Sequence, residues 1–225
     1  MNGIWFLILA VMLASFIVQR VLTSRFEKYS GEPSPHGLTG ADVARMMLQQ
    51  NGITDVTVQS VDGKLTDHYN PQTKTVNLSE GVYGSASIAA VAVAAHETGH
   101  ALQHAQGYAP LKLRSALVPV VTFANNTVQW VLLAGVLLIN IFPTLLWIGI
   151  ALFAMTTFFS FVTLPVEINA SQRAVRWLES AGVVDAGTRP MAVDALKWAA
   201  YTYVIAAIGS LATLFYYISI GNSRR

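Results

Sequence analysis

Hydrophobic positions along the chain form long apolar stretches separated by polar segments. The first stretch covers 4–18 without interruption. A second covers 115–166, where the sequence has no Asp, Glu, Lys, Arg or His. Because a membrane-spanning helix needs about 20 apolar residues, this second stretch accommodates two helices and a tight turn. Another apolar stretch follows Lys197. We predict four spans, at 4–18, 117–139, 143–164 and 200–220.

The first span has neither the basic start of a secretory signal nor a clear small-residue cleavage site, so we expect it to remain as an anchor. Pro165 is predicted to end the third span. An amphipathic helix over 166–181 should follow it and end at Gly182. Thr188 and Pro190 are typical of the first turn of a last helix.

The polar segment after the first span predicts a small α+β unit. Thr39 should cap a helix over 41–50 that ends at Asn51-Gly52. Strand patterns follow at 56–61, 65–69 and 74–78. Asp62-Gly63 suits a type I′ hairpin turn, so we expect a short antiparallel sheet. A helix from Ser85 or Ser87 to Gln106 comes next, and its first half is apolar and alanine-rich.

Composition supports a membrane protein and excludes several classes. The chain is 53% hydrophobic and 12% charged, with a mean hydropathy of +0.48. The charged share is about half of the usual one. The chain therefore has too few charged residues to give a soluble globular protein its polar surface. The net charge of +2 is too small to indicate nucleic acid as a partner. There is no cysteine, so a metal site must use His and carboxylate ligands.

Lys and Arg near the span ends predict the orientation. The segments between spans one and two and between spans three and four carry most of these cations, and both lie on one side of a four-span protein. We therefore predict a multi-pass protein of the cytoplasmic (inner) membrane whose chemistry faces the cytoplasm. Arg224-Arg225 is the one opposing signal. The supporting cations are Arg20, Arg25, Lys28, Lys112, Arg114, Arg173, Arg176 and Lys197.

The predicted helix at 85–106 contains His96-Glu97-Thr98-Gly99-His100. Residues four apart lie on one helix face, so His96 and His100 can reach one metal ion. Zinc lowers the pKa of a bound water toward about 7, and Glu97 can take a proton from that water as it attacks a carbonyl. The motif therefore indicates a zinc-dependent hydrolase with Glu97 as general base.

A catalytic zinc requires a third protein ligand, for which there are three candidates. His104 lies roughly 12 Å along the helix axis from His96, too far for one ion. Asp185 stands in Val184-Asp185-Ala186-Gly187, a sequence typical of a turn. Glu167 is the best candidate, because it is the only acidic residue between Glu97 and Glu179 and follows Pro165 where a span ends.

Several motifs of the sequence lie at 37–40, 63–69, 78–83, 95–104, 107–111 and 164–167. Together they resemble the bacterial neutral zinc metallopeptidases of the membrane. The resemblance covers nearly the whole chain and extends to the layout of the CAAX prenyl proteases and the heat-shock membrane zinc proteases. In those families a glutamate on a later helix completes a gluzincin-like ligand set, which implies Glu167 here. They also have an aspartate four residues later, where this chain has Ser171, so Asn169 or Ser171 would support a ligand histidine.

The same resemblance implies a cleft bordered by the strand at 74–78. A peptide could then add to the free edge of Thr75, Val76, Asn77 and Leu78. The hydrolysis also needs a group that stabilises the developing oxyanion. The sequence does not choose among the candidates, which are His68, Tyr69, His104, Tyr108 and Arg173.

These observations predict a mostly α integral membrane protein, with about four transmembrane helices and a small zincin-like α+β domain whose short antiparallel sheet lies beside the motif helix. The predicted function is a membrane endopeptidase with one Zn²⁺ per chain, acting on membrane proteins or peptides. One alternative is a site-2-type intramembrane protease, which would use an aspartate ligand. Another is a non-catalytic metal-binding scaffold. The predicted segments are a 1–19 anchor, the 20–114 zincin-like part, a 115–165 transmembrane hairpin, the 166–199 segment with the third ligand, and a 200–225 span.

Overall fold

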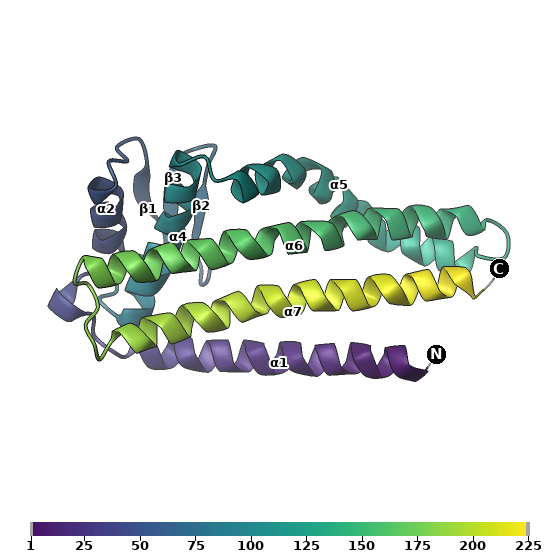
Figure 1. The fold of residues 1–225 in the computed structure, drawn as a ribbon, viewed down its shortest axis with the longest axis horizontal. Helices are drawn as coiled ribbons and strands as arrows, with labels where there is room; N and C mark the ends of the chain where they lie inside the picture. Colours follow the sequence, from purple (N-terminus) through teal and green to yellow (C-terminus); the bar gives the residue numbers. More distant parts are fainter. Residues whose placement is uncertain (1, 224–225) are drawn as a thin grey trace. The chain divides into compact units, whose positions relative to one another are not determined.

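The computed structural model describes residues 2–223, so Arg224-Arg225 lies outside the described residues. Figure 1 shows the ribbon of the chain with its helices and strands. The chain divides into two compact units. Unit 1 contains 1–17, 112–164 and 202–225, and unit 2 contains 18–111 and 165–201. The elements are α1 (Asn2–Ser30), the 3₁₀ turn η1 (Pro35–Gly37), α2 (Gly40–Gln50), β1 (Thr57–Val61), β2 (His68–Asn70), β3 (Thr75–Ser79), α3 (Glu80–Tyr83), α4 (Ile88–Ala105), α5 (Ala109–Leu137), α6 (Pro143–Ser180) and α7 (Arg189–Asn222).

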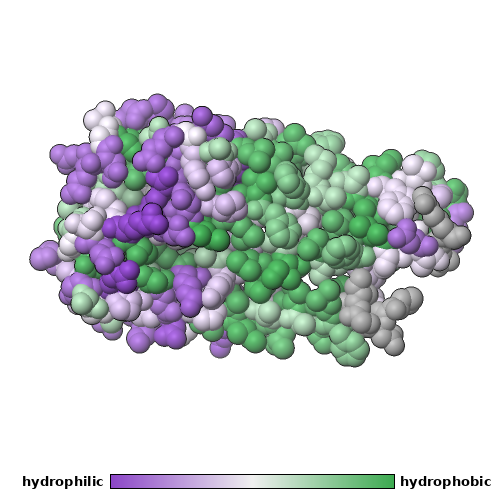
Figure 2. All heavy atoms as spheres, in the orientation of Figure 1, coloured by the Kyte–Doolittle hydropathy of each residue, from purple (hydrophilic) through white to green (hydrophobic). Residues whose placement is uncertain are grey.

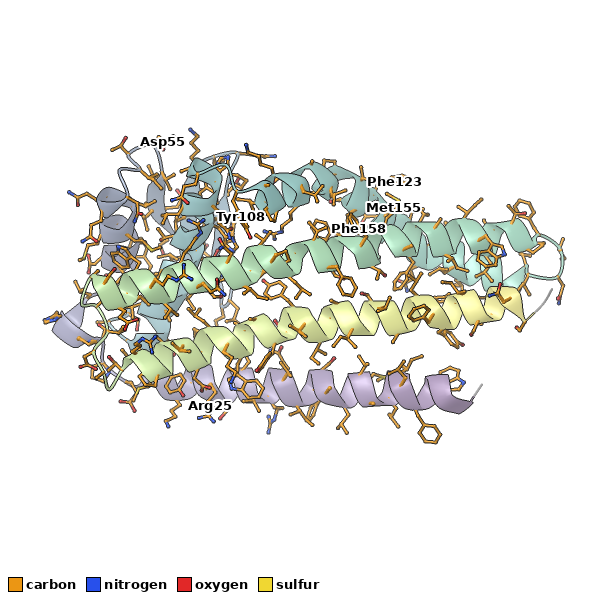
Figure 3. All side chains as sticks on the ribbon, in the orientation of Figure 1. Arg25, Asp55, Tyr108, Phe123, Met155 and Phe158 are labelled. Atoms are coloured by element: carbon orange, nitrogen blue, oxygen red, sulfur yellow. The ribbon has the colours of Figure 1, made fainter. Side chains whose placement is uncertain are left out.

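Unit 1 consists of the apolar parts of α1, α5, α6 and α7. These four helices are long and apolar enough to cross a membrane, as the sequence predicts. Hydrophobic residues cover most of the visible face of this unit in Figure 2. Phe123, Met155 and Phe158, labelled in Figure 3, are among its exposed large side chains. A surface of this kind suits lipid rather than water.

Close packing of α5 against α6 holds unit 1 together. Leu132 and Leu146 are buried in its core cluster. A Cβ on Gly135 would lie only 2.6 Å from the Leu146 Cα, so only glycine allows the two backbones to approach so closely. Small residues at helix contacts are the usual means of helix association in a membrane.

The sheet of unit 2 is mixed, which corrects the antiparallel prediction. Its strand order is β1-β3-β2, with β1 parallel and β2 antiparallel to β3. Asp62-Gly63 therefore does not form a hairpin. The tight turn is at Asn70, whose Oδ1 accepts hydrogen bonds from the Gln72 and Thr73 amides. The chain leaving β1 instead makes a longer loop that places β2 on the far side of β3.

Strand β3 is central, and its five residues are all buried. Both of its backbone edges are occupied, because it pairs with β1 along one side and β2 along the other. The expected peptide-binding edge at Thr75–Leu78 is therefore wrong. The free edges of this sheet belong to β1 and β2, and β2 is the strand next to α4 in the site described below.

Helices α2 and α4 begin and end close to where the sequence predicts. Thr39 caps α2 through a reciprocal pair of hydrogen bonds with Asp42. Ser87 caps α4 by accepting a hydrogen bond from the Ala90 amide. The apolar first half of α4 is almost wholly buried, and α2, α3, the sheet and the end of α6 contribute to the same core. This core makes α4 a fixed support for the polar residues that follow.

Three helices are longer than predicted. Pro165 does not end a helix but lies inside α6, which continues to Ser180. An internal proline costs roughly 3 kcal/mol, but Val166, Ala170 and Ala174 are fully buried just after it and hold the helix in place. Helix α1 likewise extends past residue 18 to Ser30, where Tyr29 donates a hydrogen bond to Asp194 of α7. Helix α5 begins at Ala109 rather than at residue 117.

Candidate metal centre and active site

Helix α4 presents its two histidines one turn apart on one face. The ring centroids of His96 and His100 are 4.8 Å apart and their planes are nearly perpendicular. Both side chains are largely buried, with 13% of the His96 surface and 8% of the His100 surface exposed. The buried, alanine-rich turns before them fix the helix, so both rings project from a rigid element.

Glu167 of α6 lies between the two rings. Its Oε2 is 3.3 Å from His96 Nε2 and 3.6 Å from His100 Nε2. The potential ligand atoms of these three residues all lie within 4.8 Å of one another. Burial lowers the pKa of His100, but its hydrogen bond to Glu167 and the charges of Glu97 and Glu167 outweigh burial, so the pKa is raised. The carboxylate thus makes the centre favourable for a positive charge.

Gly99 permits this meeting of α4 and α6. A Cβ at this position would lie 2.8 Å from the Ala170 carbonyl oxygen, a distance that side-chain carbons essentially never show. Ala170 is itself small and fully buried. The glycine within the motif therefore brings α6 close enough for Glu167 to reach both histidines.

Gln103 orients His100, a role that our sequence analysis missed. Its Nε2 donates to the Val166 carbonyl oxygen at 2.8 Å and to Asn169 Oδ1 at 3.0 Å. Both of those atoms are acceptors, so the amide orientation is fixed and Oε1 faces His100 Nδ1 at 3.0 Å. An oxygen can only accept, so Nδ1 must donate and the lone pair lies on Nε2. A polar residue three positions after His100, on a buried helix face, was the available signal.

Ser171 is the partner of His96. Its Oγ lies 3.0 Å from His96 Nδ1. When the ring donates from Nδ1 to this hydroxyl, the lone pair of Nε2 faces Glu167. Ser171 is the residue that stands where the resembling families have an aspartate. Asn169, the other candidate, contacts Gln103 rather than either histidine.

Glu97 is held by strand β2. The Tyr69 amide donates to Glu97 Oε2 at 3.1 Å, and the Tyr69 hydroxyl lies 2.7 Å from His104 Nδ1. Burial, followed by the charge of Asp55, raises the pKa of Tyr69, so the hydroxyl keeps its proton at neutral pH. Glu97, Tyr69 and His104 therefore form a connected group. The Tyr69 amide binds Oε2 of Glu97 and does not bind the other carboxylate oxygen, Oε1.

The other predicted residues lie in different surroundings. His68 contacts the Thr66 carbonyl oxygen and Asn77, within the sheet. Arg173 donates to Asn169 and Gln106, and its guanidinium lies 5.9 Å from the centre of the ring of Tyr108, which is labelled in Figure 3. These contacts give His68, Arg173 and Tyr108 structural roles in their own surroundings.

Asp185 is a turn residue. Its Oδ1 accepts hydrogen bonds from the Thr188 hydroxyl and from the Thr188 and Gly187 amides. The Thr188 hydroxyl contributes most to lowering the pKa of this carboxyl. Asp185 is not part of the histidine-glutamate group, so the structure gives no support to an aspartate-ligated centre.

Comparison with known proteins agrees with this geometry. Residues 4–222 match the family described as "putative neutral zinc metallopeptidase". The chain belongs to this family. It is also 44% identical over 215 residues to "Putative membrane protease YugP" of Bacillus subtilis (strain 168), covering 96% of this chain and 95% of the relative. No solved structure matches the chain.

The ligand atoms of His96, His100 and Glu167 fit the metal that the family's description implies. Zinc takes imidazole nitrogen and carboxylate oxygen at about 2.0–2.2 Å, so two ligands in a tetrahedral site lie roughly 3.3 Å apart. The two nitrogen-to-Oε2 distances, 3.3 and 3.6 Å, are close to this value. Both Nδ1 atoms have partners on the protein, which leaves both Nε2 atoms for an ion. Among residues 2–223 this is the group of His and carboxylate side chains suited to a metal.

Proposed function

We propose that this protein is a membrane-embedded zinc metalloendopeptidase that hydrolyses peptide bonds in membrane proteins or peptides. The family and the membrane protease relative support protease activity, and the four apolar helices support a membrane location. The observation that carries the proposal is the meeting of His96 Nε2, His100 Nε2 and Glu167 Oε2 beside Glu97. We infer one zinc per chain, held by these three residues.

Each residue in the proposed mechanism has a separate task. Ser171 and Gln103 orient the imidazoles so that both Nε2 atoms face the same point. When bound, zinc supplies Lewis-acid chemistry, which acidifies water and polarises a carbonyl. Tyr69 holds Oε2 of Glu97, so Oε1 is the atom that takes a proton from the attacking water. Glu97 then returns this proton to the amide nitrogen as the peptide bond breaks.

The Tyr69–His104 pair is the best candidate for stabilising the oxyanion. Among the five candidates, Tyr69 is the residue that contacts the proposed base, and its hydroxyl contacts His104. His68, Tyr108 and Arg173 have the structural ties described above. We also infer that substrate approaches along β2, because β3 is enclosed on both edges.

Two substitutions test the proposal. Glu97→Gln should keep zinc, because Glu97 is not a ligand, and should abolish cleavage of a peptide substrate. His96→Ala should lose both zinc and cleavage. Zinc content and cleavage are measured on the same purified full-length preparations. Loss of zinc from Glu97→Gln, or full cleavage by it, would disprove the role of Glu97, and a zinc-loaded wild type that cleaves no peptide would favour a non-catalytic scaffold.

The cations of unit 2 support an active site facing the cytoplasm. Arg25 on α1 and Lys197 on α7 lie in this unit, near the ends of predicted spans. We propose that Ser60 and Asp185 face the cytoplasm and Ile141 the opposite side. Single cysteines at these positions can be labelled in intact cells by an impermeant reagent. Labelling at position 60 but not at 141 would show that the orientation is the reverse of the proposed one.

A further inference from the structure

A groove of about 390 Å³ lies between the unit 2 parts of α6 and α7. The end of α6 and the start of α7 supply all of its walls. It is separate from the Glu97 side of the metal centre, where Tyr69 and His104 lie. Its lining residues are Ile168, Ser171, Gln172, Val175, Arg176, Arg189, Val193, Leu196, Lys197 and Ala200.

The charges in this groove have one sign. Arg176, Arg189 and Lys197 line it, and its lining has no acidic residue. Arg189 is paired with Glu179, and Lys197 lies 5.6 Å from the centre of the Tyr201 ring. All three cations are exposed, so they can reach a ligand. This groove is complementary to an anion.

The groove ends in the apolar residues Ile168 and Ala200, with Lys197 one helical turn before this end. Helix α6 runs through it from Ile168 toward Arg176, whereas α7 runs from Arg189 toward Ala200. Because the chain turns back between these helices, Ile168 and Ala200 mark one end, and Arg176 and Arg189 the other. A suitable ligand therefore has an anionic head and an apolar tail.

The position of the groove matches a membrane interface. After Lys197 the sequence of α7 becomes apolar, and Trp198 and Tyr201 form an edge-on aromatic pair there. Trp and Tyr are enriched at the level of lipid headgroups. The apolar end of the groove is thus the end directed along α7 into its hydrophobic part.

We propose that this groove binds one anionic phospholipid, with its headgroup along Arg176, Arg189 and Lys197 and an acyl chain passing Ile168 and Ala200. Basic residues at the membrane surface attract anionic lipids, and a groove adds a defined place for one molecule. Ser171 lines the groove and also contacts His96, so the lipid lies one side chain away from the metal centre.

The test compares lipid binding to purified full-length protein by native mass spectrometry from detergent. The probes are dioleoyl phosphatidylglycerol and dioleoyl phosphatidylcholine. Wild type should bind the anionic lipid at least about tenfold more tightly. The variant Arg176→Gln/Lys197→Gln should lose roughly 25-fold in affinity for it, at about fivefold per cation, with little change for phosphatidylcholine.

Two further variants separate a site from general surface charge. Arg20→Gln/Lys28→Gln removes the same charge from α1 and should keep the preference. Ala200→Trp should weaken phosphatidylglycerol binding while leaving all three cations in place. Each variant is first checked for an unchanged melting temperature.

The proposal fails if wild type shows no preference, if the groove variant keeps it, or if the α1 variant loses it equally. It also fails if Ala200→Trp binds like wild type. Soluble glycerol phosphate that binds as tightly as the lipid would show a phosphate site without a lipid, and would likewise overturn the proposal.

Discussion

The two histidines of α4 present the same atom to Glu167 but are held in different ways. His100 is oriented by Gln103, which is on its own helix, is fully buried and also binds the Val166 carbonyl of α6. His96 is oriented by Ser171, which is on α6 and is half-buried. The orientation of His100 is thus fixed twice, whereas that of His96 depends on the position of α6 alone.

This difference suggests an order of importance among the supporting residues. An unsatisfied buried N–H costs about 1–3 kcal/mol. Gln103 is fully buried whereas Ser171 is partly exposed, so water can replace the Ser171 hydroxyl more readily than the Gln103 amide. Loss of the Gln103 contact should therefore be more harmful than loss of the Ser171 contact. Changes that affect both histidines at once should be more harmful than either.

The largest effect is expected for Glu167→Gln, because both histidines lose the shared carboxylate. The amide is a weaker ligand and carries no charge, so zinc affinity should fall by more than about 100-fold, and cleavage should be lost. Zinc is measured after dialysis against a mild chelator, beside a peptide-cleavage assay.

Asp185→Asn is the matched control for Glu167→Gln. It removes the same charge from a turn residue that does not face the histidines, so zinc and activity should stay near wild type. Metal loss from Asp185→Asn with retention in Glu167→Gln would disprove the assigned ligand set and favour the site-2-type alternative.

The second-largest loss of zinc affinity is expected for Gly99→Ala, which changes the close approach of α4 and α6. Gly99→Ala places a Cβ 2.8 Å from the Ala170 carbonyl oxygen, so α6 must move and Glu167 with it. Overpacking costs about 1–3 kcal/mol, partly offset by the roughly 1 kcal/mol that alanine gains in a helix. We expect zinc affinity to fall by at least about tenfold, measured by chelator competition.

Gly81→Ala provides the control for this change. Gly81 lies in the short helix α3, and a Cβ there would meet nothing within 4 Å. This variant should match wild type in both melting temperature and zinc affinity. If Gly99→Ala also binds zinc like wild type, the close approach of the helices does not position Glu167.

The third-largest loss of zinc affinity is expected for Gln103→Leu, which affects His100 but not His96. Gln103→Leu leaves the buried His100 Nδ1–H without its acceptor, so zinc affinity should fall by about 10- to 100-fold. The melting temperature should also fall, because the bonds to Val166 and Asn169 are lost. Gln106→Leu removes an exposed amide from the end of the same helix and should change zinc affinity little. An equal effect of the two substitutions would mean that Gln103 does not orient His100.

The sequence was sufficient to predict the features set by local rules. The four apolar helices follow from the absence of charge and from length, and the cap at Thr39 follows from a side chain that accepts a backbone hydrogen bond. The sequence left the start of α4 open between Ser85 and Ser87, and the structure places the cap at Ser87. The spacing of His96 and His100 is a property of one helix, so it too could be predicted. Glu167 was predicted as a ligand because it follows the third predicted span, and in the structure it lies beside both histidines.

The predictions that failed concern features that depend on contacts between segments distant in the sequence. Asp62-Gly63 has a local preference for a hairpin turn, but burial of β3 between two partners decides the sheet order. Pro165 has a local preference to end a helix, but buried side chains on its C-terminal side keep α6 continuous. Gln103 could not be assigned, because its role requires knowing that the Val166 carbonyl and Asn169 lie opposite it.

The smallest effect is expected for Ser171→Ala. The methyl group removes the partner of His96 Nδ1 and leaves the helix intact, since alanine is the best helix former. Ser171 is partly exposed, so water can take the place of its hydroxyl, and Glu167 still restrains the ring from its other side. Zinc affinity should fall by about three- to tenfold, at or below the lower limit for partners of metal ligands. Ser180→Ala, in which the hydroxyl lost from α6 binds only the Trp177 carbonyl, is the control and should bind zinc like wild type. The decisive comparison is with Gln103→Leu under the same chelator. A loss for Ser171→Ala as large as that for Gln103→Leu would mean that the two imidazoles are equally dependent on their partners, and that burial does not set the difference between them.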